Sequence, residues 1–537
     1  GTVEFLHQPE DGGLYFTEVN PRLQVGHAVT EATAGLDLVK LQLHVAMGGG
    51  LEPDPPVERG HAVEVRINAQ DAERGFATAA GELELLALPT GPGIRVDTGL
   101  SEGDVIPPDY DALIAKVVAW GRDRDESFAR LRRAVGEMAV VVRGGATNRS
   151  LLLDLLDRPE VVDGTADIGW IDRLDQAEGL VSERGADIAL IEAAINTYDH
   201  EEAIARDAFY ASARRGRPKA PPPVGASIRL HRRRQGYAFS VSRTAPSRYR
   251  LTVDGSTVVA DVERLGRFGA YMHIGDRRHR VVTVSNDPDH VVEVAGVAHR
   301  IARDEGRLVR APAPSLVVSV APSVGDELRE GDPVAVLESM KMETAVPAPF
   351  DGVVREVLVA GNVQVDAGAP LVRMEPLRPD QEGEPGPRVG FGELGATAAT
   401  APDLAVLDEI GSLFSGFDEG EKEAAGLADR LTALHAERPG DRVLIERAIA
   451  LLGMFTDIAE LTRNRPPLGA LEFVEEAVRS PLEHFHRYLR SLDAYHEGLH
   501  AALRESLARA LAHYGVADLA PGPELAEAAY RIFLAEQ

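Results

Sequence analysis

Cysteine is absent from this chain of 537 residues, which excludes disulfide bonds and thiolate metal sites. No run of eighteen apolar residues and no secretory leader pattern is present, which argues against a membrane span and against export. Positive charge is scarce, and the formal net charge of −28 would repel the phosphates of nucleic acids. We therefore expect a cytoplasmic globular protein that binds neither nucleic acid nor membrane.

The remaining composition is that of an ordinary globular protein, with 44% hydrophobic and 26% charged residues. A chain of this length accommodates about three to five domains. The organisation of those domains has to come from local patterns along the sequence.

The most informative pattern surrounds Lys341, which stands between Met340 and Met342 at the break between two strand-like runs. This arrangement predicts the tip of a β-hairpin, from which the lysine projects into water as a nucleophilic amine that can be acylated. The alternative is an ordinary surface lysine at a turn. Residues 349–372 repeat the strand and turn pattern of the preceding segment, which predicts two similar four-strand halves that face each other.

Residues 311–375 resemble a biotin carboxyl carrier domain, and Glu338-Ser-Met-Lys-Met342 resembles the biotinylation motif of that family. The resemblance implies a flattened β-barrel and biotin attached to Lys341 through an amide bond. It also implies a biotin protein ligase as a partner, because that enzyme forms the amide.

Near the start of the chain, residues 2–6 and 13–20 predict two strands of a hairpin. Glu4 and Glu18 can point the same way, and Asn20 lies on the same face as Glu18 because side chains of a strand alternate. Two carboxylates and an amide oxygen suit a hard cation that is bound together with nucleotide phosphates. The alternative is a solvated hairpin edge.

Residues 18–31 closely resemble the signature of biotin carboxylases, which are ATP-grasp enzymes. The resemblance continues through four further segments and ends near Trp170; these segments are residues 35–40, 60–69, 93–97 and 107–111. It implies ATP as a substrate, with Mg²⁺ or Mn²⁺ held by Glu4, Glu18 and Asn20, and ATP contacted by Glu4, Leu6 and Glu18.

The same resemblance implies that Arg22, Gln24 and the backbone of Val25 bind bicarbonate. Arg95 would lie near the ureido oxygen of biotin and, with Arg22, stabilise the negative charge that develops there; a guanidinium suits this role because it stays charged and its donors are held in a plane. One position departs from the family pattern, because Gly26 stands where the family has the glutamate thought to deprotonate bicarbonate. Another group takes that role, or this copy is impaired, or the glycine is a sequence error.

The regions after residue 182 show other patterns. Residues 186–213 have helical spacing, and several short alternating strands follow, which resembles the helix and seven- or eight-strand barrel of the BT domain, the domain that joins carboxylase and transferase in acyl-CoA carboxylases. Residues 377–402 are rich in Pro, Gly and Glu and predict a flexible linker that lets the carrier visit two active sites. The remaining residues predict helices and vaguely resemble the central region of single-chain acetyl-CoA carboxylases.

We therefore predict a multi-domain α/β and β fold class. Its expected parts are the C-terminal part of an ATP-grasp biotin carboxylase (1–180), a BT-like helix and barrel (183–310), a biotinyl domain (311–376), the linker (377–402) and a helical central region (403–537). We expect a ligase that is part of a biotin-dependent acyl-CoA carboxylase of fatty acid metabolism. We also expect the carboxyltransferase to lie outside this chain, so that acyl-CoA is an indirect partner. The protein is expected to form a homo-oligomer.

Two alternatives stay open: a biotin carboxylase with another acceptor, pyruvate or urea, and a non-catalytic carrier and scaffold. Gly1 is expected to lie within an ATP-grasp fold whose N-terminal part is missing, so that this chain alone does not carboxylate biotin.

Overall fold

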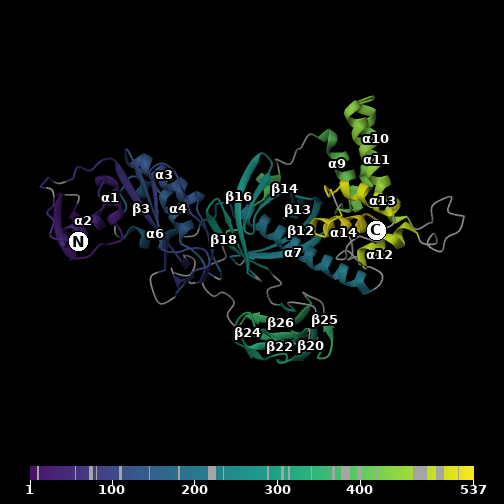
Figure 1. The fold of residues 1–537 in the computed structure, drawn as a ribbon, viewed down its shortest axis with the longest axis horizontal. Helices are drawn as coiled ribbons and strands as arrows, with labels where there is room; N and C mark the ends of the chain where they lie inside the picture. The colour runs from purple at the N-terminus through teal and green to yellow at the C-terminus, as the bar shows by residue number, and fades with distance from the viewer. Residues whose placement is uncertain are drawn as a thin grey trace. The chain divides into compact units, whose positions relative to one another are not determined.

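The computed structural model places the chain in two compact units, each of which is described by itself (Figure 1). The first unit contains Gly1–Ala186 and Glu293–His299, and the second contains Asp187–Val292 and Arg300–Gln537. The structure describes residues 1–537 apart from 9–10, 52, 55, 72–76, 80, 108–111, 144, 168, 179–181, 216–224, 234, 287–288, 304–307, 312–314, 340–341, 366–368, 377–386, 396–401, 418–420, 464–479, 491–500, 518 and 537.

The first unit begins with the predicted hairpin, formed by β1 (Thr2–Gln8) and β2 (Gly13–Asn20). A short loop leads into α1 (His27–Ala34), which ends at Gly35 in the left-handed conformation that glycine adopts without steric cost. Helix α2 (Leu38–Ala46) follows, and its N-cap Asp37 accepts a hydrogen bond from the backbone N–H of Lys40.

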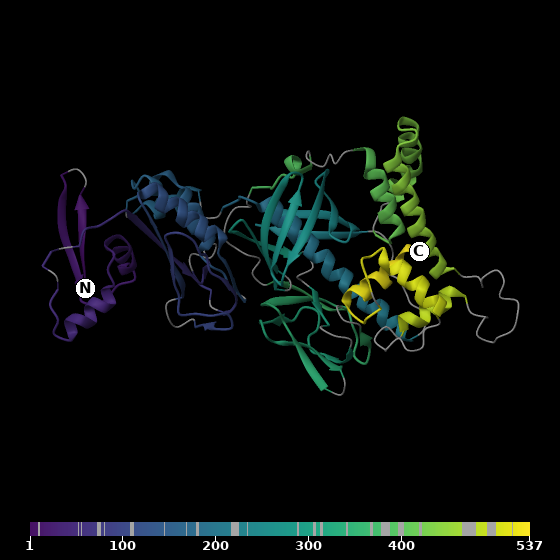
Figure 2. The same ribbon diagram turned by 45° about the horizontal axis from the view of Figure 1, so that its top comes forward.

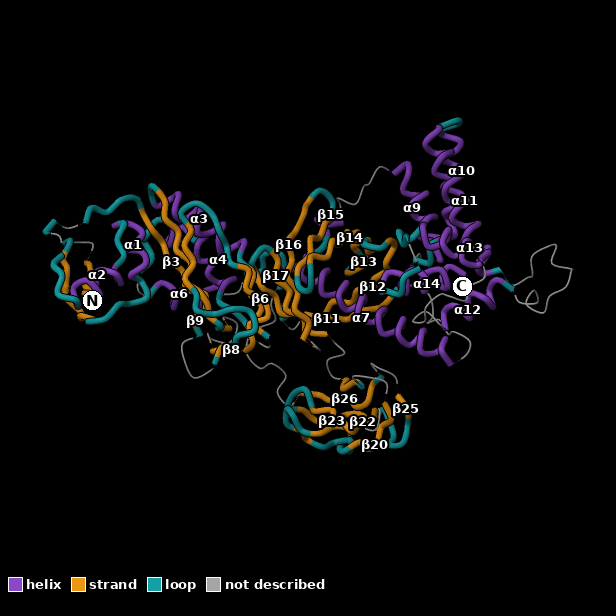
Figure 3. The backbone as a smooth tube through the Cα atoms, viewed as in Figure 1, coloured by secondary structure: helices purple, strands orange, loops and turns teal. Residues whose placement is uncertain are grey.

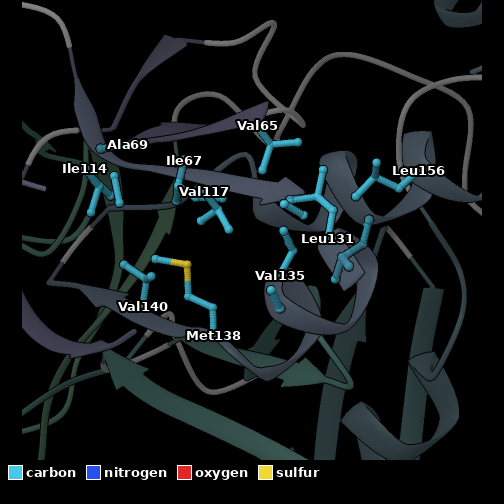
Figure 4. Packing of buried hydrophobic residues seen from close by; sticks show 14 of the residues in the cluster. Val65, Ile67, Ala69, Ile114, Val117, Leu131, Val135, Met138, Val140 and Leu156 are labelled. Carbon is cyan, nitrogen blue, oxygen red and sulfur yellow. The ribbon is translucent and has the colours of Figure 1, made fainter. Parts of the chain in front are cut away.

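The core of the first unit lies between a three-stranded antiparallel sheet and α3 (Arg124–Glu137). The strands are in the order β3 (His61–Asn68), β9 (Leu113–Gly121) and β7 (Ile94–Asp97). Figure 4 shows apolar side chains from the sheet, including Ile67 and Val117, packed against Leu131 and Val135 of α3. Burial of this apolar surface positions the strand that carries Arg95.

Smaller elements complete the first unit. They are β4 (Gln70–Asp71), β5 (Ala77–Thr78), β6 (Gly81–Ala87), β8 (Val105–Ile106), β10 (Ala139–Val142), α4 (Arg149–Asp157), α5 (Pro159–Val162) and α6 (Trp170–Glu178). Strands β10, β6 and β8 form a second antiparallel sheet.

The second unit contains the long helix α7 (Ala186–Arg215) and a closed antiparallel barrel of eight strands, which confirms the predicted barrel. The strands are β11 (Ala226–Arg232), β12 (Gln235–Ala245), β13 (Arg248–Val253), β14 (Ser256–Leu265), β15 (Gly269–Ile274), β16 (Arg277–Asn286), β17 (Asp289–Val294) and β18 (Val297–Arg303).

The N-terminal half of α7 lies inside this barrel. Residues 188–195 of the helix are buried without interruption, which is unusual for a helix with only one packed face. Side chains of four different strands reach it, because Tyr249, Arg264, Thr283 and His290 all form hydrogen bonds or ion pairs with α7. Figure 2 shows the helix continuing from the barrel to the C-terminal helices.

The carrier region consists of two four-stranded sheets, as the internal repeat predicted (Figure 3). One sheet has the order β19 (Leu308–Arg310), β26 (Pro370–Pro376), β24 (Gly352–Val357) and β21 (Glu327–Leu328). The other has the order β23 (Met342–Pro347), β22 (Pro333–Ser339), β20 (Ser315–Val320) and β25 (Gln364–Val365). Since β19 pairs with β26, residues 308–310 belong to this domain, and the predicted boundary at 310/311 falls after a strand that the domain needs.

The C-terminal region is helical, as predicted. Its described helices are α9 (Pro402–Phe414), α10 (Glu421–Glu437), α11 (Arg442–Thr462), α12 (Pro481–Arg490), α13 (Ala501–Ala512) and α14 (Pro523–Glu536). Asp441 caps α11 by accepting hydrogen bonds from the backbone N–H groups of Val443 and Leu444. This region shares a hydrophobic core with the second half of α7, in which Phe209 contacts Tyr530 and Phe533 at ring-centroid distances of 5.0 and 4.8 Å.

The predicted flexible linker needs a correction. Residues 388–395, including the short helix α8 (Gly392–Gly395), pack on the barrel, and Phe391 is only 2% exposed. Proline and glycine content predicted flexibility, but Phe391 gains apolar burial that composition alone does not reveal. Within the part of the chain that the structure describes, no helix is both long enough and apolar enough to cross a bilayer.

Candidate active site

The hairpin at the start of the chain brings the predicted acidic side chains together. Glu4 on β1 is directly opposite Glu18 on β2 in the antiparallel register. The side-chain amide nitrogen of Asn20 donates hydrogen bonds to Glu4 Oε1 at 3.1 Å and to Glu18 Oε1 at 2.8 Å. All three side chains therefore lie on one face of the hairpin, as the two-residue period of a strand predicted.

This set of oxygen atoms fits a hard divalent cation. The amide N–H groups of Asn20 lie between the two carboxylates, and rotation of the amide by half a turn would put its oxygen there instead. Magnesium is commonly held by one or two carboxylates together with phosphate oxygens. Among the described residues no group of three or more His, Asp or Glu side chains is arranged to hold a metal.

The loop after β2 connects this cluster to the second part of the site. Gln24 donates a hydrogen bond from Nε2 to Glu4 Oε1 at 3.0 Å, and its backbone carbonyl lies 2.8 Å from Nδ1 of His27. Gln24 is thus held at both its side chain and its backbone. Arg22 is exposed and less constrained, because its Nη1 donates a long hydrogen bond of 3.5 Å to the carbonyl oxygen of the neighbouring Leu23.

Arg95 lies on β7 between two carboxylates. Its Nη1 is 2.6 Å from Glu31 Oε2 of α1, and its Nε is 2.8 Å from Asp97 Oδ1 on the same strand. Glu31 also accepts a hydrogen bond from the backbone N–H of Leu38 at 2.7 Å, which ties the start of α2 to the same network. The guanidinium plane is consequently held from two sides.

The charges of this network are strongly stabilised. Burial is the largest single influence and raises the pKa of Glu31 and of Asp97. Hydrogen bonds from Arg95, from the backbone of Leu38 to Glu31 and from Lys116 to Asp97, together with the neighbouring positive charges, outweigh burial and hold both carboxyl pKa values below their usual range. The hydrogen bonds to Asp97 and Glu31 raise the pKa of Arg95. The arginine therefore stays cationic at any physiological pH, as a group that stabilises developing negative charge must.

Lys116 connects Arg95 to the predicted bicarbonate loop. It is nearly buried on the otherwise apolar strand β9, where its Nζ lies 3.1 Å from Asp97 Oδ2 and 3.4 Å from the carbonyl oxygen of Val25. A buried ammonium group needs such partners to offset the loss of hydration. The backbone of Val25 is thereby fixed relative to the strand that carries Arg95.

A hollow of about 620 Å³ opens beside Arg95. Its lining combines apolar side chains of α2 with charged groups of α1 and β7; the lining residues are His27, Glu31, Leu36, Asp37, Val39, Lys40, Leu43 and Arg95. Charged and titratable side chains form most of this lining, so the hollow presents a polar surface beside Arg95.

Two further positions that the sequence singled out are Leu6 and Gly26, and Leu6 is more exposed than its predicted role requires. Leu6, expected to line the nucleotide pocket, is 55% exposed on β1. Gly26 is the N-cap of α1 and has ordinary right-handed dihedral angles, φ −73° and ψ 0°. A Cβ atom at Gly26 would meet no atom within 4 Å, so the position accepts a Cβ without a clash.

Strands β22 and β23 of the carrier domain, which flank the predicted attachment site in sequence, form a hairpin. Ser339 pairs with Met342 across the ends of the two strands, which confirms that the chain reverses there. Lys341 itself lies outside the described residues, so its position at the tip stays a prediction.

Sequence reasoning identified the acidic hairpin but missed the groups that hold Arg95. Glu31 lies within the quoted signature, and Asp97 is two residues after Arg95 on the same strand, so the strand period could have indicated that they share a face. Lys116 could have been found as a lone lysine in an apolar strand.

Three family models match this chain. Residues 1–53 match "Carbamoyl-phosphate synthase L chain, ATP binding domain", residues 64–173 match "Biotin carboxylase C-terminal domain", and residues 294–374 match "Biotin-requiring enzyme". The site described above spans the first two of these matches, and the hairpin of Lys341 lies in the third.

Curated relatives match the chain over different shares of its length. The chain is 41% identical over 175 residues to biotin carboxylase of Pseudomonas aeruginosa, which covers 32% of this chain and 38% of the relative. It is 30% identical over 376 residues to the biotin-dependent acyl-coenzyme A carboxylase alpha3 subunit of Mycobacterium leprae, covering 70% and 54%. It is 28% identical over 444 residues to the mitochondrial methylcrotonoyl-CoA carboxylase subunit alpha of Arabidopsis thaliana, covering 70% and 58%.

The chain thus spans between 38% and 58% of the length of these relatives. It carries, in one polypeptide, a segment of an ATP-grasp domain, the C-terminal domain of a biotin carboxylase and a biotin-requiring carrier domain, and its relatives include the alpha subunits of acyl-CoA carboxylases.

Proposed function

We propose that this chain is part of a biotin-dependent acyl-CoA carboxylase. It carries biotin on Lys341, contributes residues to the ATP- and bicarbonate-driven carboxylation of that biotin, and delivers the carboxyl group to an acyl-CoA through a carboxyltransferase outside the chain. The observation that carries this proposal is the presence of a carrier hairpin and an organised cluster of carboxylates, amides and a fixed arginine in one polypeptide.

The residues of the cluster have separate roles in this proposal. Glu4, Glu18 and Asn20 hold Mg²⁺ or Mn²⁺ against ATP phosphates, because hard oxygen donors converge there. Gln24 and Arg22, with the backbone of Val25, bind bicarbonate; Gln24 is already oriented by Glu4 and His27.

Arg95 stabilises the negative charge that develops on the ureido oxygen of biotin. Biotin, when bound, would supply the nitrogen that is carboxylated. The two carboxylates that hold its guanidinium reduce the reorganisation needed at the moment of reaction. Helix α7 and the eight-stranded barrel around it support the BT-like assignment of this region. In this proposal the region joins the chain to other subunits or domains. A biotin protein ligase and a homo-oligomeric state complete the proposal.

Covalent attachment is the first test. We expect the chain, produced together with a biotin protein ligase, to gain the mass of one biotinyl group. A Lys341→Arg variant should gain none, because the substitution keeps the charge but removes the amine that the ligase acylates. A modification found at another lysine, or no modification of the unaltered chain, would contradict the proposal.

Gly26 favours a second candidate, a carrier and scaffold without carboxylase activity, because glycine offers no group that accepts a proton from bicarbonate. The test is ATP hydrolysis that depends on bicarbonate in the presence of free biotin, measured for the natural full-length chain and for its Gly26→Glu form. A Cβ atom at this position meets no neighbouring atom within 4 Å. Activity that appears only in Gly26→Glu would support the scaffold; equal activity in both forms would exclude it.

The acceptor is tested separately. Pyruvate and urea remain alternatives to acyl-CoA, and the assay is transfer of labelled carboxyl from the biotinylated chain to each acceptor in the presence of a carboxyltransferase subunit.

A further inference from the structure

A short segment after the carrier domain binds the barrel through several directed contacts. Arg388 forms hydrogen bonds to both carboxylate oxygens of Asp254 at 2.7 Å and donates a third bond to the carbonyl of Gly236 at 3.1 Å. Its guanidinium also lies over the ring of Tyr237, 4.8 Å from the centroid. A bidentate pair that also stacks on an aromatic ring is a specific arrangement, unlike an isolated surface ion pair.

The backbone and the next aromatic residue extend this contact. The N–H of Val389 donates to the hydroxyl of Tyr237 at 2.9 Å. The ring of Phe391 meets Tyr237 and Phe239 edge-on, with centroid distances of 6.1 and 5.8 Å. Edge-to-face contacts at these distances are favourable beyond the area that they bury.

The location of these contacts follows from the strand pattern of β12. Tyr237 and Phe239 are buried, whereas the alternate residues Ala238 and Ser240 are exposed, so the two aromatic rings belong to the inward face of the barrel. Asp254 lies in the turn between β13 and β14, at the barrel end that also contains the turn between β11 and β12. Phe391 therefore packs at that end of the barrel, against side chains of its interior.

We propose that residues 388–391 form a clip, Arg-Val-Gly-Phe, and that the end of the barrel is its binding site, so that the clip fixes the C-terminal tether of the carrier domain to the barrel. The occupant of the site is this chain's own segment. The inference goes beyond the proposed function and does not depend on it, because it concerns where the carrier domain is held rather than what it carries.

The clip shortens the tether. The last strand of the carrier domain, β26, ends at Pro376, and the clip begins twelve residues later. A fully extended chain of that length spans about 40 Å. If the clip is released, the next fixed element is α9, which begins at Pro402. The chain from Pro376 to Pro402 spans about 90 Å when it is fully extended.

Release would therefore about double the maximum span of the C-terminal tether, from about 40 Å to about 90 Å. On the other side the domain is joined to β18 by only the few residues between Arg303 and Leu308. The closed clip thus gives the carrier a second attachment and restricts its rotation about the first.

The experiment measures the freedom of the carrier in the full chain without biotin. Because the sequence contains no cysteine, nitroxide labels can be placed only where cysteines are introduced, at Ala238→Cys on the barrel and at Val324→Cys on the carrier; both positions are exposed. We expect Phe391→Ala to broaden the distance distribution between the labels. Val389→Ala is the matched control, because it keeps the backbone N–H that binds Tyr237.

Tryptic cleavage after Arg388 gives an independent readout. Loss of the buried Phe391 ring should raise the cleavage rate at least about tenfold, whereas Val389→Ala should leave it near the original rate. Arg388→Gln, a change at an exposed residue that the barrel core does not need, should broaden the label distances in the same way. Unchanged distances in both Phe391→Ala and Arg388→Gln would overturn the proposal, and so would a cleavage rate that Phe391→Ala does not alter.

Discussion

The buried histidine between α7 and the barrel should make the second unit sensitive to acid. His290 is 1% exposed and lies among three polar neighbours. Its Nδ1 is 2.8 Å from the hydroxyl of Ser285, while its Nε2 is 3.0 Å from both Thr197 Oγ1 and Nε of Arg303. Because the guanidinium of Arg303 donates to Nε2, the neutral ring carries its proton on Nδ1, from which it donates to the hydroxyl of Ser285.

Burial, together with the positive charges of Arg303 and His200, lowers the pKa of His290 from 6.5 to about 3. The folded state therefore keeps the ring neutral while the unfolded chain takes up a proton below pH 6.5. The stabilisation is complete above pH 6.5 and is lost by about 1.4 kcal/mol per pH unit as the pH falls toward 3. Between pH 6.5 and pH 5 this single group should cost about 2 kcal/mol of the free energy of unfolding.

Hydrogen exchange of the amides of β16 and β17 is the suitable assay. The two tryptophans, Trp120 and Trp170, both belong to the first unit and cannot report on the barrel. We expect the free energy of the opening that exposes these amides to exchange to fall between pH 6.5 and pH 5. In His290→Gln most of this decrease should be absent. His273→Asn, at an exposed position of β15, is the control and should keep it. An identical pH dependence in His290→Gln and the unaltered chain would refute the reasoning.

Three further predictions follow from other parts of the structure. Arg531→Met should lower the free energy of unfolding of the helical region by about 2 kcal/mol in urea denaturation, because it removes the charged hydrogen bond from Arg531 to the partly buried carboxylate of Glu202, which Arg243 also contacts. Gly60→Ala should lower the thermal transition of the first unit, because Gly60 has φ +71° and a Cβ would lie 2.3 Å from a carbonyl oxygen of β9. Glu31→Gln should leave the fold intact but weaken the hold on Arg95, seen as faster exchange of its guanidinium protons by NMR.

Local patterns predicted the elements whose structure depends on neighbouring residues in sequence. Strand alternation and a short turn predicted that Glu4, Glu18 and Asn20 lie on the same face of the hairpin. Alternation of apolar and polar residues predicted the strands of the barrel.

Contacts between distant segments could not be predicted in this way. The core shared by Phe209 and Tyr530 joins residues more than three hundred positions apart, and nothing local to either indicates the other. The packing of Phe391 was missed for a related reason, because its Gly- and Pro-rich surroundings lack the periodicity that marks a regular element.

The continuity of α7 has a mechanical consequence. One half of this helix is enclosed by β-strands, and the other half contributes Phe209 to the packing of the C-terminal helices. At 1.5 Å per residue the helix is about 45 Å long, and an uninterrupted helix resists twisting and bending over that distance. A rotation of the C-terminal helices would therefore also move the N-terminal half of α7, where Glu192 forms an ion pair with Arg264 of the barrel.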